Sequence, residues 1–207
     1  MTIRRLERPF FTQPTLIIAR ALLGQILVKI EEGGDRLSGM IVETEAYIGT
    51  DDLACHARAG RTARNASMWG PPGHAYVYFT YGMHWMLNMV TERDDFAAAV
   101  LIRSLIPMEG LSIMRSRRAG RSDSTLTDGP AKLCQALGIH RDLDGLDLCL
   151  PSSPLFLQTG IEIEDNIATI GPRIGLNKVP EPWKSIPWRF RVLPEYFNQI
   201  TKEERNQ

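Results

Sequence analysis

Residues 74–90, HAYVYFTYGMHWMLNMV, limit the possible folds of this chain more than any other segment. The segment is rich in aromatic and other strand-favouring side chains, and the pair Tyr81–Gly82 lies at its middle. Two strand-like runs joined by a short link that contains glycine are typical of a β-hairpin. The sequence therefore predicts an antiparallel hairpin whose tip carries Tyr81.

Strands and short helices are expected in the rest of the chain. The predicted strands lie near 25–31, 39–48 and 97–107, with shorter strand-like pieces such as WRFRV in 145–198. The predicted helices lie over about 14–23, with Thr12 placed to cap it, and in PMEGLSIMRSRRAG and DGPAKLCQALGI. In the last of these, Pro130 falls in the first turn and Gly138 at the end.

Length and composition favour one domain. With 207 residues, of which 43% are hydrophobic and 23% charged, the chain can bury one sizeable core. We expect an α+β fold in a single compact domain over residues 1–207. Its core would be a curved, mainly antiparallel sheet with flanking helices and a protruding β-hairpin, and its tail would fray from about residue 199.

Several classes of protein are disfavoured by composition. No run of 18 apolar residues occurs, and the start, MTIRRLERPFFTQ, has no apolar stretch of the kind found in signal peptides, so a cytoplasmic protein is expected. The cysteines Cys55, Cys134 and Cys149 are odd in number and widely spaced, which indicates neither a disulfide framework nor a metal site. The net charge is zero, so a polyanionic partner would have to be held by local clusters of basic residues.

Two arginine clusters could hold such a partner. One contains Arg58, Arg61 and Arg64, and the other lies in MRSRRAGR, residues 114–121. A charge run by itself is most often a solvated face of the protein. The first cluster is the stronger candidate because it lies in a glycine-containing loop close to the strand 39–48.

The strand 39–48 carries an unusual polar face. Alternation places Ile41, Glu43, Glu45 and Tyr47 on one side, and the apolar residues of the strand on the other. Carboxylates on an open strand face are usually just solvated. However, Arg103 lies in the very apolar strand AAAVLIRSLIP, where its charge needs a partner, and a carboxylate on a neighbouring strand is the nearest candidate. A glutamate held by an arginine beside aromatic rings could act as a general base.

Other catalytic schemes have less support. Cys55 and His56 are adjacent in an extended stretch, where neighbouring side chains point in opposite directions, so a Cys/His pair is disfavoured. The chain contains no nucleophile elbow of the G-x-S-x-G type, no P-loop and no G-x-G-x-x-G. His74, His84 and His140 lack the spacing of metal ligands. Neither a cofactor nor a metal is expected.

The chain resembles the alkyladenine (3-methyladenine) DNA glycosylase family. The resemblance covers about residues 9–192 and rests on blocks such as ETEAY, YVYFTYGM, LIRSL and GPAKLCQAL, which occur in the family's order. It implies an enzyme that flips a damaged purine out of duplex DNA and hydrolyses its N-glycosidic bond, leaving an abasic site. The expected partner is double-stranded DNA containing damaged purines, bound by a protein monomer in a bacterial cytoplasm, associated with the nucleoid.

The same resemblance assigns roles to individual residues. Glu45 would activate the water and Arg103 would help to hold it. The base pocket would be formed by Tyr47, His56, Tyr78, Asn88 and Leu101. The DNA wedge would be formed by Tyr81 and Met83, and the phosphate contacts by Arg61, Arg64 and Lys132. Alternation along the strands independently puts Glu45 with Tyr47 and Leu101 with Arg103. Two alternatives stay open: a lesion-binding module without enzymatic activity, and a related hydrolase that acts on RNA.

Overall fold

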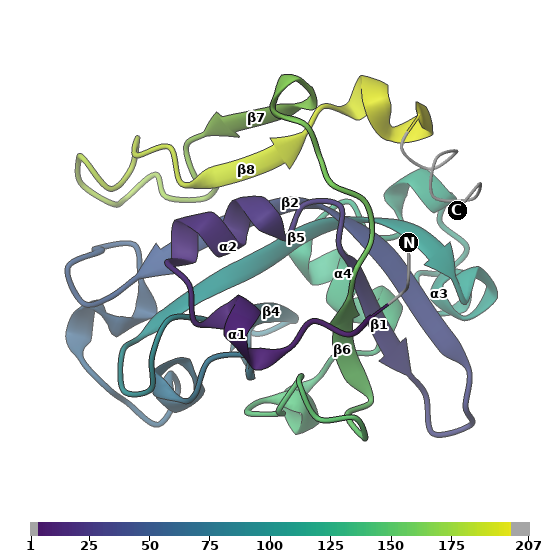
Figure 1. The fold of residues 1–207 in the computed structure, drawn as a ribbon, viewed down its shortest axis with the longest axis horizontal. Coiled ribbons are helices and arrows are strands. Elements are labelled where there is room, and N and C mark those ends of the chain that lie inside the picture. The colour runs from purple at the N-terminus through teal and green to yellow at the C-terminus, as the bar shows by residue number, and fades with distance from the viewer. Residues whose placement is uncertain (1–3, 200–207) are drawn as a thin grey trace.

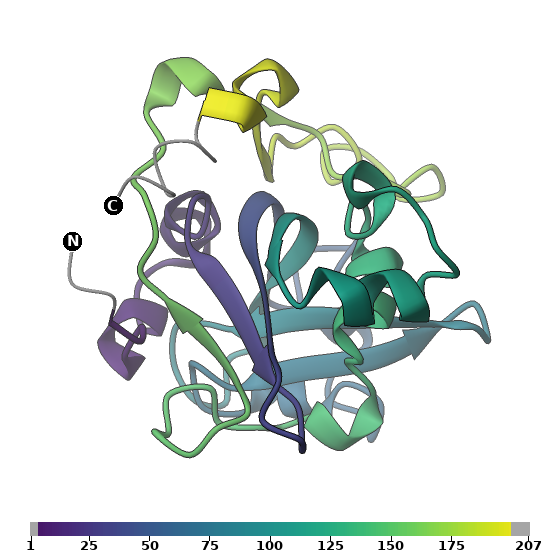
Figure 2. The ribbon, with the colours of Figure 1, turned by 90° about the vertical axis from the view of Figure 1, so that its right-hand side faces the viewer.

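The predicted hairpin is present in the structure, a computed structural model that describes residues 4–199. Strands β3 (Ala75–Thr80) and β4 (His84–Val90) pair antiparallel. Tyr81 and Gly82 have φ values of 52° and 68°, which is the pattern of a type I′ turn and matches the twist of the flanking strands. The Met83 N–H closes the turn by donating to the Thr80 carbonyl at 3.2 Å. Figure 2 shows the hairpin extending from one side of the molecule.

The hairpin is one edge of a mixed-length antiparallel sheet of eight strands (Figure 1). The strand order is β3-β4-β5-β2-β1-β6, and β8 pairs with both β2 and β7. The bounds of these strands are β1 Ile26–Ile30, β2 Arg36–Ile48, β5 Ala98–Glu109, β6 Leu155–Gln158, β7 Ala168–Gly171 and β8 Arg189–Val192. The α+β fold with a protruding hairpin is therefore confirmed, and the three strands predicted outside the hairpin are present, two of them longer than predicted.

The helices are short. The α-helices are α1 Arg8–Phe11, α2 Thr15–Ala21, α3 Leu111–Arg117 and α4 Pro130–Leu137, and the 3-10 turns are η1 His56–Ala59, η2 Ala66–Trp69, η3 Asp123–Thr125, η4 Arg141–Leu143, η5 Asp165–Ile167 and η6 Pro194–Tyr196. Helix α4 begins at Pro130 and ends at Gly138 in the left-handed conformation, as predicted. None of the helices in residues 4–199 is long and apolar enough to cross a membrane.

The predicted capping role of Thr12 is wrong. Residue Pro14 occupies the N-cap of α2, and the Thr12 hydroxyl instead donates to the Pro9 carbonyl at 3.0 Å. The reason is that the chain forms a separate turn of helix, α1, directly before α2, and Thr12 is its C-cap. The predicted frayed tail lies largely outside the described residues.

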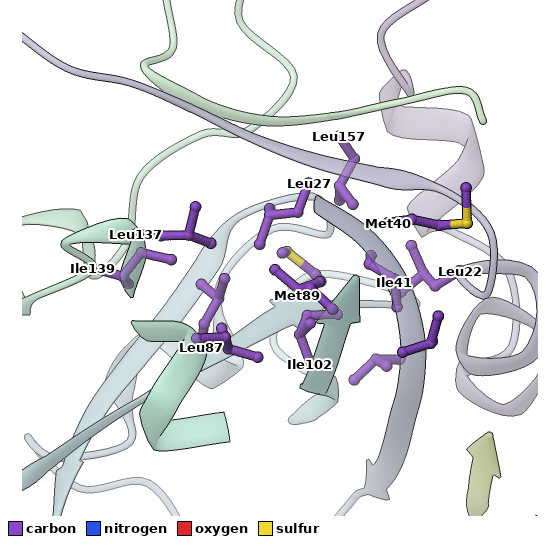
Figure 3. Packing of buried hydrophobic residues seen from close by; sticks show 14 of the residues in the cluster. Leu22, Leu27, Met40, Ile41, Leu87, Met89, Ile102, Leu137, Ile139 and Leu157 are labelled. Atoms are coloured by element: carbon purple, nitrogen blue, oxygen red, sulfur yellow. The ribbon is translucent and has the colours of Figure 1, made fainter. Parts of the chain in front are cut away.

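The main core lies between the sheet and helices α2 and α4. Helix α2 packs against β2 and β5, and α4 packs against β4 and β5. Fully buried side chains from these elements interlock (Figure 3), among them Leu22, Met40, Leu87, Ile102 and Leu137. Burying each such side chain contributes about 1.5–3 kcal/mol to stability, so the sheet is a rigid base for the residues on its other face.

A double irregularity interrupts the pairing of β2 with β5. Ile41 lies opposite Leu105 and Glu43 opposite Ser104, but Thr44 lies opposite Ile102, so Val42 and Arg103 have no direct counterpart. Irregularities of this kind redirect side chains. Ile41, which simple alternation placed beside Glu43, is fully buried in the main core instead. Arg103 is the side chain that the same irregularity leaves beside two glutamates.

Candidate active site

Arg103 joins two carboxylates on the neighbouring strand. Its Nη1 donates to Glu45 Oε2 at 3.2 Å and its Nε donates to Glu43 Oε1 at 3.1 Å. Arg189 of β8 reaches Glu43 Oε1 from the other side of β2 at 3.0 Å. Burial disfavours the charge of Arg103, but Glu45 and Glu43 outweigh this effect and raise its pKa. The predicted pairing of the strand arginine with a carboxylate is therefore present.

Glu45 is fully buried and has two further donors. The Tyr47 hydroxyl donates to Oε2 at 2.8 Å, and the Ile174 N–H donates to Oε1 at 2.6 Å. A carboxylate offers about four acceptor positions, so the three donors leave room for one more hydrogen bond on Oε1. Burial raises the pKa of Glu45, although Arg103, the Ile174 N–H and the Tyr47 hydroxyl oppose this effect. The carboxylate is thus oriented and more basic than an exposed one.

A cavity of about 300 Å³ opens beside this carboxylate. Three contacts of Glu45 line it, namely Tyr47, Arg103 and Ile174. Its walls also include the predicted pocket residues His56, Tyr78, Asn88 and Leu101, together with Tyr76 and the hairpin residue Tyr81. Arg103 therefore lines the same cavity as all five predicted pocket residues, whereas Glu45 does not line it and lies directly behind three lining residues that contact it.

The register of the sheet explains why these residues converge. Tyr76 lies opposite Asn88, Asn88 opposite Leu101, Leu101 opposite Glu45, and Glu45 opposite Arg189. Residues directly opposite each other in a sheet point to the same face. One row across five strands thus delivers an aromatic ring, an amide, an apolar side chain and a carboxylate to one side.

The aromatic wall of the cavity is built around His56. Its Nδ1 lies 2.8 Å from the Tyr76 hydroxyl, and its ring meets Tyr78 edge to face with centroids 4.4 Å apart. Although His56 as a residue is exposed, burial of its ring against these tyrosines and the charges of Arg64 and Arg58 lower its pKa to about 4. At neutral pH this wall is uncharged.

Cys55 does not act with His56. Its Sγ accepts the Ala57 N–H at 3.4 Å and lies 3.8 Å from the Met68 sulfur, whereas the His56 ring contacts Tyr76 and Tyr78. Burial raises the pKa of the Cys55 thiol to about 12, which keeps it protonated. The expectation that this stretch is extended is wrong, because His56 begins the 3-10 turn η1 with Cys55 as its N-cap, and Cys55 is a buried core residue.

Asn88 is held by the backbone of the neighbouring strand. It is 4% exposed, and its side-chain Nδ2 donates to the Tyr76 carbonyl at 3.0 Å. This bond leaves the second N–H and the carbonyl oxygen of the amide free to contact whatever enters the cavity.

Of the predicted DNA-contacting residues, Tyr81 lines the cavity, and the set as a whole differs in exposure and in contacts. Tyr81 and Met83, at the hairpin tip, are 81% and 67% exposed. Arg64 donates to the Phe79 carbonyl at 3.2 Å and lies 5.9 Å from the centre of the Tyr78 ring. Arg61 and Lys132 already pair with acidic residues, Arg61 with Asp95 at 3.2 Å and Lys132 with Asp128 at 2.9 Å.

Two arginines of the second cluster form ion pairs. Arg115 binds both oxygens of Asp123, each at 2.8 Å, and Arg117 binds Glu31.

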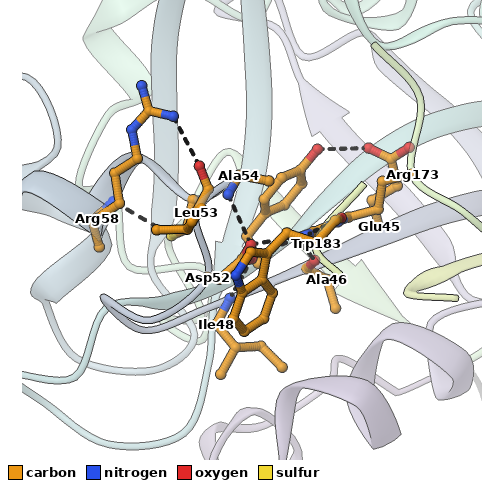
Figure 4. A network of polar contacts seen from close by, with 12 residues as sticks. Glu45, Ala46, Ile48, Asp52, Leu53, Ala54, Arg58, Arg173 and Trp183 are labelled. Carbon is orange, nitrogen blue, oxygen red and sulfur yellow. Dashed lines mark hydrogen bonds and ion pairs between the residues drawn. The ribbon is translucent and has the colours of Figure 1, made fainter. Parts of the chain in front are cut away.

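Sequence reasoning missed the ion pair between Asp52 and Arg173, whose side chains are both fully buried (Figure 4). It also missed Ile174, because a backbone N–H leaves no trace in residue type. Arg173 does leave a signal: it lies in the apolar stretch IGPRIG, and the argument that demanded a partner for Arg103 applies to it equally.

Comparisons of the sequence with a family model and with individual relatives point to the same family. A sequence model of the family described as Methylpurine-DNA glycosylase (MPG) matches residues 9–195. A relative from Chlorobaculum parvum is 45% identical over 187 residues, covering 90% of this chain and 87% of its own. Relatives from Methanocella arvoryzae and Myxococcus xanthus are 49% and 46% identical and cover 89% and 90% of this chain, and 90% and 89% of their own. The names of all three contain the words 3-methyladenine DNA glycosylase.

The family pattern includes every strand and every side chain of the cavity described above, since it spans residues 9–195. The relatives match over nearly the same length at close to half identity. This chain belongs to the methylpurine-DNA glycosylase family.

Proposed function

We propose that this DNA glycosylase flips an alkylated or deaminated purine out of duplex DNA into the cavity, and hydrolyses its N-glycosidic bond with water that Glu45 activates. The observation that carries the proposal is an oriented, buried carboxylate whose contacts Tyr47, Arg103 and Ile174 line the same cavity as a wall of aromatic rings. Chemistry on a base inside a duplex requires its extrusion, because the glycosidic bond is otherwise out of reach.

Glu45 suits the role of general base. Its Oε1 retains one acceptor position, and we propose that the water occupies it from the cavity side, where Ile174 and Arg103, both contacts of Glu45, line the wall. Arg103 favours the ionised form of Glu45, while burial keeps the carboxylate basic enough to take a proton. The water loses this proton to Glu45 as its oxygen bonds to the sugar carbon, and the purine departs with the electrons of the glycosidic bond.

The rest of the cavity suits a purine. Tyr47, His56 and Tyr78 offer ring surfaces, and stacking of a base on an aromatic side chain contributes about 1–3 kcal/mol in single-strand binders. Their contribution offsets part of the cost of extrusion. Asn88 can test the edge of the base because its amide both donates and accepts hydrogen bonds.

The hairpin tip and the nearby cations suit the surrounding DNA. Tyr81 and Met83 would fill the gap left by the extruded nucleotide, since both are exposed next to the cavity. Arg64, Arg61 and Lys132 would contact phosphates, the last two by exchanging an acidic partner for a phosphate oxygen. The proposed enzyme acts as a monomer in the cytoplasm, where such DNA is found.

The reaction is proposed to stop at the abasic site. A lyase step would need an amine to form a Schiff base with the sugar, and no lysine occurs among the cavity-lining residues of the described part of the chain. Borohydride added during turnover should therefore trap no covalent complex of protein and DNA, and a trapped complex would contradict the water mechanism.

A panel of duplexes, each with one lesion, tests the function directly. The lesions are 3-methyladenine, 7-methylguanine, hypoxanthine and an etheno adduct, and the readout is release of the free base under single-turnover conditions. Matched RNA duplexes form a second arm. Release from at least one DNA lesion is expected. Tight binding without release would support a lesion-binding module, and release from RNA alone would support a different hydrolase.

A further inference from the structure

The segment that follows β7 crosses over the active site and is mostly exposed. Ile174 is 50% exposed, and Pro172 and Gly175 beside it are exposed as well. Arg173 is the exception, because it is only 4% exposed. Yet this segment supplies the Ile174 N–H, which lies 2.6 Å from Glu45 Oε1. Its position must be held by something other than the packing of Ile174 itself.

The Arg173 guanidinium supplies that hold. It pairs with both oxygens of Asp52, and donates to the Ala46 carbonyl at 2.9 Å and the Trp183 carbonyl at 3.2 Å. Ala46 is the residue of β2 between Glu45 and Tyr47. The crossing segment is therefore tied to β2, the strand that carries the proposed general base. The tie joins Arg173, the neighbour of Ile174, to Ala46, the neighbour of Glu45.

The same guanidinium supports a second contact of Glu45. It lies 4.7 Å from the centre of the Tyr47 ring, whose hydroxyl donates to Glu45 Oε2. Asp52 in turn accepts the Ile48 and Ala54 N–H groups at 3.3 and 3.0 Å, which orients the loop that leaves β2. Figure 4 shows Asp52 at the centre of this network.

We propose that the buried Asp52–Arg173 ion pair positions the general base, by holding the Ile174 N–H on Glu45 Oε1 and the Tyr47 ring beneath Oε2. Arg173 and Asp52 are positioning residues, since neither reaches the cavity lining. The inference rests on the proposed role of Glu45. A second tie, from Arg189 Nε to the Pro172 carbonyl at 2.8 Å, holds the start of the segment but not the Ile174 end.

Loss of the Ile174 contact would change the pKa of Glu45 in a definite direction. Glu45 is faced by Arg103 from β5, by Tyr78 from β3, by Glu43 and Tyr47 from its own strand, and by the Ile174 N–H. The N–H stabilises the ionised carboxylate, so losing it raises the pKa of Glu45 further. Activity that needs ionised Glu45 would then be lost at a higher pH as the solution is acidified.

The first test measures the contact without any reaction. In the ¹⁵N-labelled protein without DNA, the Ile174 amide proton should be shifted far downfield and should titrate with Glu45, and its resonance is assigned with Ile174→Val. In Arg173→Lys the downfield shift and the titration should be lost, because lysine cannot reproduce the forked contacts to Asp52, Ala46 and Trp183.

The second test measures the consequence for catalysis. Single-turnover base release is followed against pH for the wild type, for Arg173→Lys and for the neutral pair Asp52→Asn/Arg173→Met, which remains usable if the single variant folds poorly. The acidic midpoint should rise by about one pH unit, as expected for a carboxylate that loses one donor. Arg20→Lys is the matched control. Arg20 in α2 binds the Ile163 carbonyl and Asp165, which precede β7, and so also ties the C-terminal part of the chain to the rest of the protein without contacting Glu45.

The outcomes separate the two proposals. An unchanged Ile174 signal and an unchanged midpoint in folded Arg173 variants would overturn the positioning role while leaving the glycosylase proposal intact. An equal shift in Arg20→Lys would also overturn it, because general loosening would then suffice. Absence of base release by the wild type would instead overturn the glycosylase proposal.

Discussion

The buried charges directly behind the cavity lining, called the floor below, and the exposed tip of the hairpin depart from the usual pattern of residue burial in opposite ways. At the floor, Glu45, Asp52 and the side chain of Arg173 carry charges in fully buried positions. At the tip, Tyr81 and Met83 expose most of their apolar surface. Charged side chains are seldom fully buried. Large apolar side chains that are exposed together, as Phe79, Tyr81 and Met83 are on this hairpin, are typical of an interaction surface.

The two regions differ in how their side chains are held. Each buried charge at the floor has several partners, and removing one partner of such a pair typically costs about 3–5 kcal/mol. At the tip the turn is held by backbone conformation, whereas the Tyr81 side chain remains open to solvent. The floor is organised without any ligand, whereas under the proposed function the tip would gain its packing only from the DNA. Chemistry and base extrusion should therefore be separable by mutation.

Glu45→Gln should have the largest effect, confined to chemistry. The variant should still bind lesion duplex, but single-turnover base release should fall by about 100- to 10,000-fold, because glutamine cannot accept the proton of the water. Thermal unfolding and duplex binding serve as controls for folding. Near-normal release by a folded variant would show that Glu45 is not the general base. The floor would then have no separate role in the chemistry.

Tyr81→Ala should have an intermediate effect, confined to extrusion. Release from a well-paired lesion should fall by at least about tenfold, or roughly 1.4 kcal/mol, because the gap in the duplex is no longer filled. The loss should be smaller when the same lesion lies opposite a gap or a poorly pairing base, where extrusion is already less costly. Comparing the two substrates is the measurement, and equal losses on both would assign Tyr81 to the fold or the chemistry.

Arg64→Ala should have the smallest effect, confined to affinity. Log affinity is expected to fall with log salt at a slope of roughly −3 to −5, because the neutral chain can offer only a few cations to phosphates. The variant should reduce the magnitude of this slope by about one, measured by duplex binding at several salt concentrations. Arg115→Ala is the control, since Arg115 lies in α3, binds both oxygens of Asp123 and is not among the residues proposed to contact phosphates. A slope near zero in the wild type would mean that these cations do not face DNA.

Local patterns were sufficient for much of the fold and for part of the site. The hairpin follows from two strand-like runs around Tyr81–Gly82, and helix α4 follows from its Pro130 and Gly138 boundaries. Alternation was sufficient to put Glu45 beside Tyr47, and the apolar surroundings of Arg103 were sufficient to require a carboxylate partner. In each case the governing contacts involve near neighbours or the simple cost of burying a charge, and both can be read from a single sequence.

The tertiary structure alone decided which distant segments complete the site. Ile174 meets Glu45 and Arg173 meets Asp52 across more than 120 residues of sequence, because β7 and β8 bring the chain back along β2. The same return explains why Arg189 shares Glu43 with Arg103. Such contacts depend on sheet register and on the irregularity opposite Glu43, and one residue of slip would redirect every side chain of a strand. Residue types therefore determined what chemistry this chain can carry, whereas the long-range register determined which backbone N–H and which arginines hold it in place.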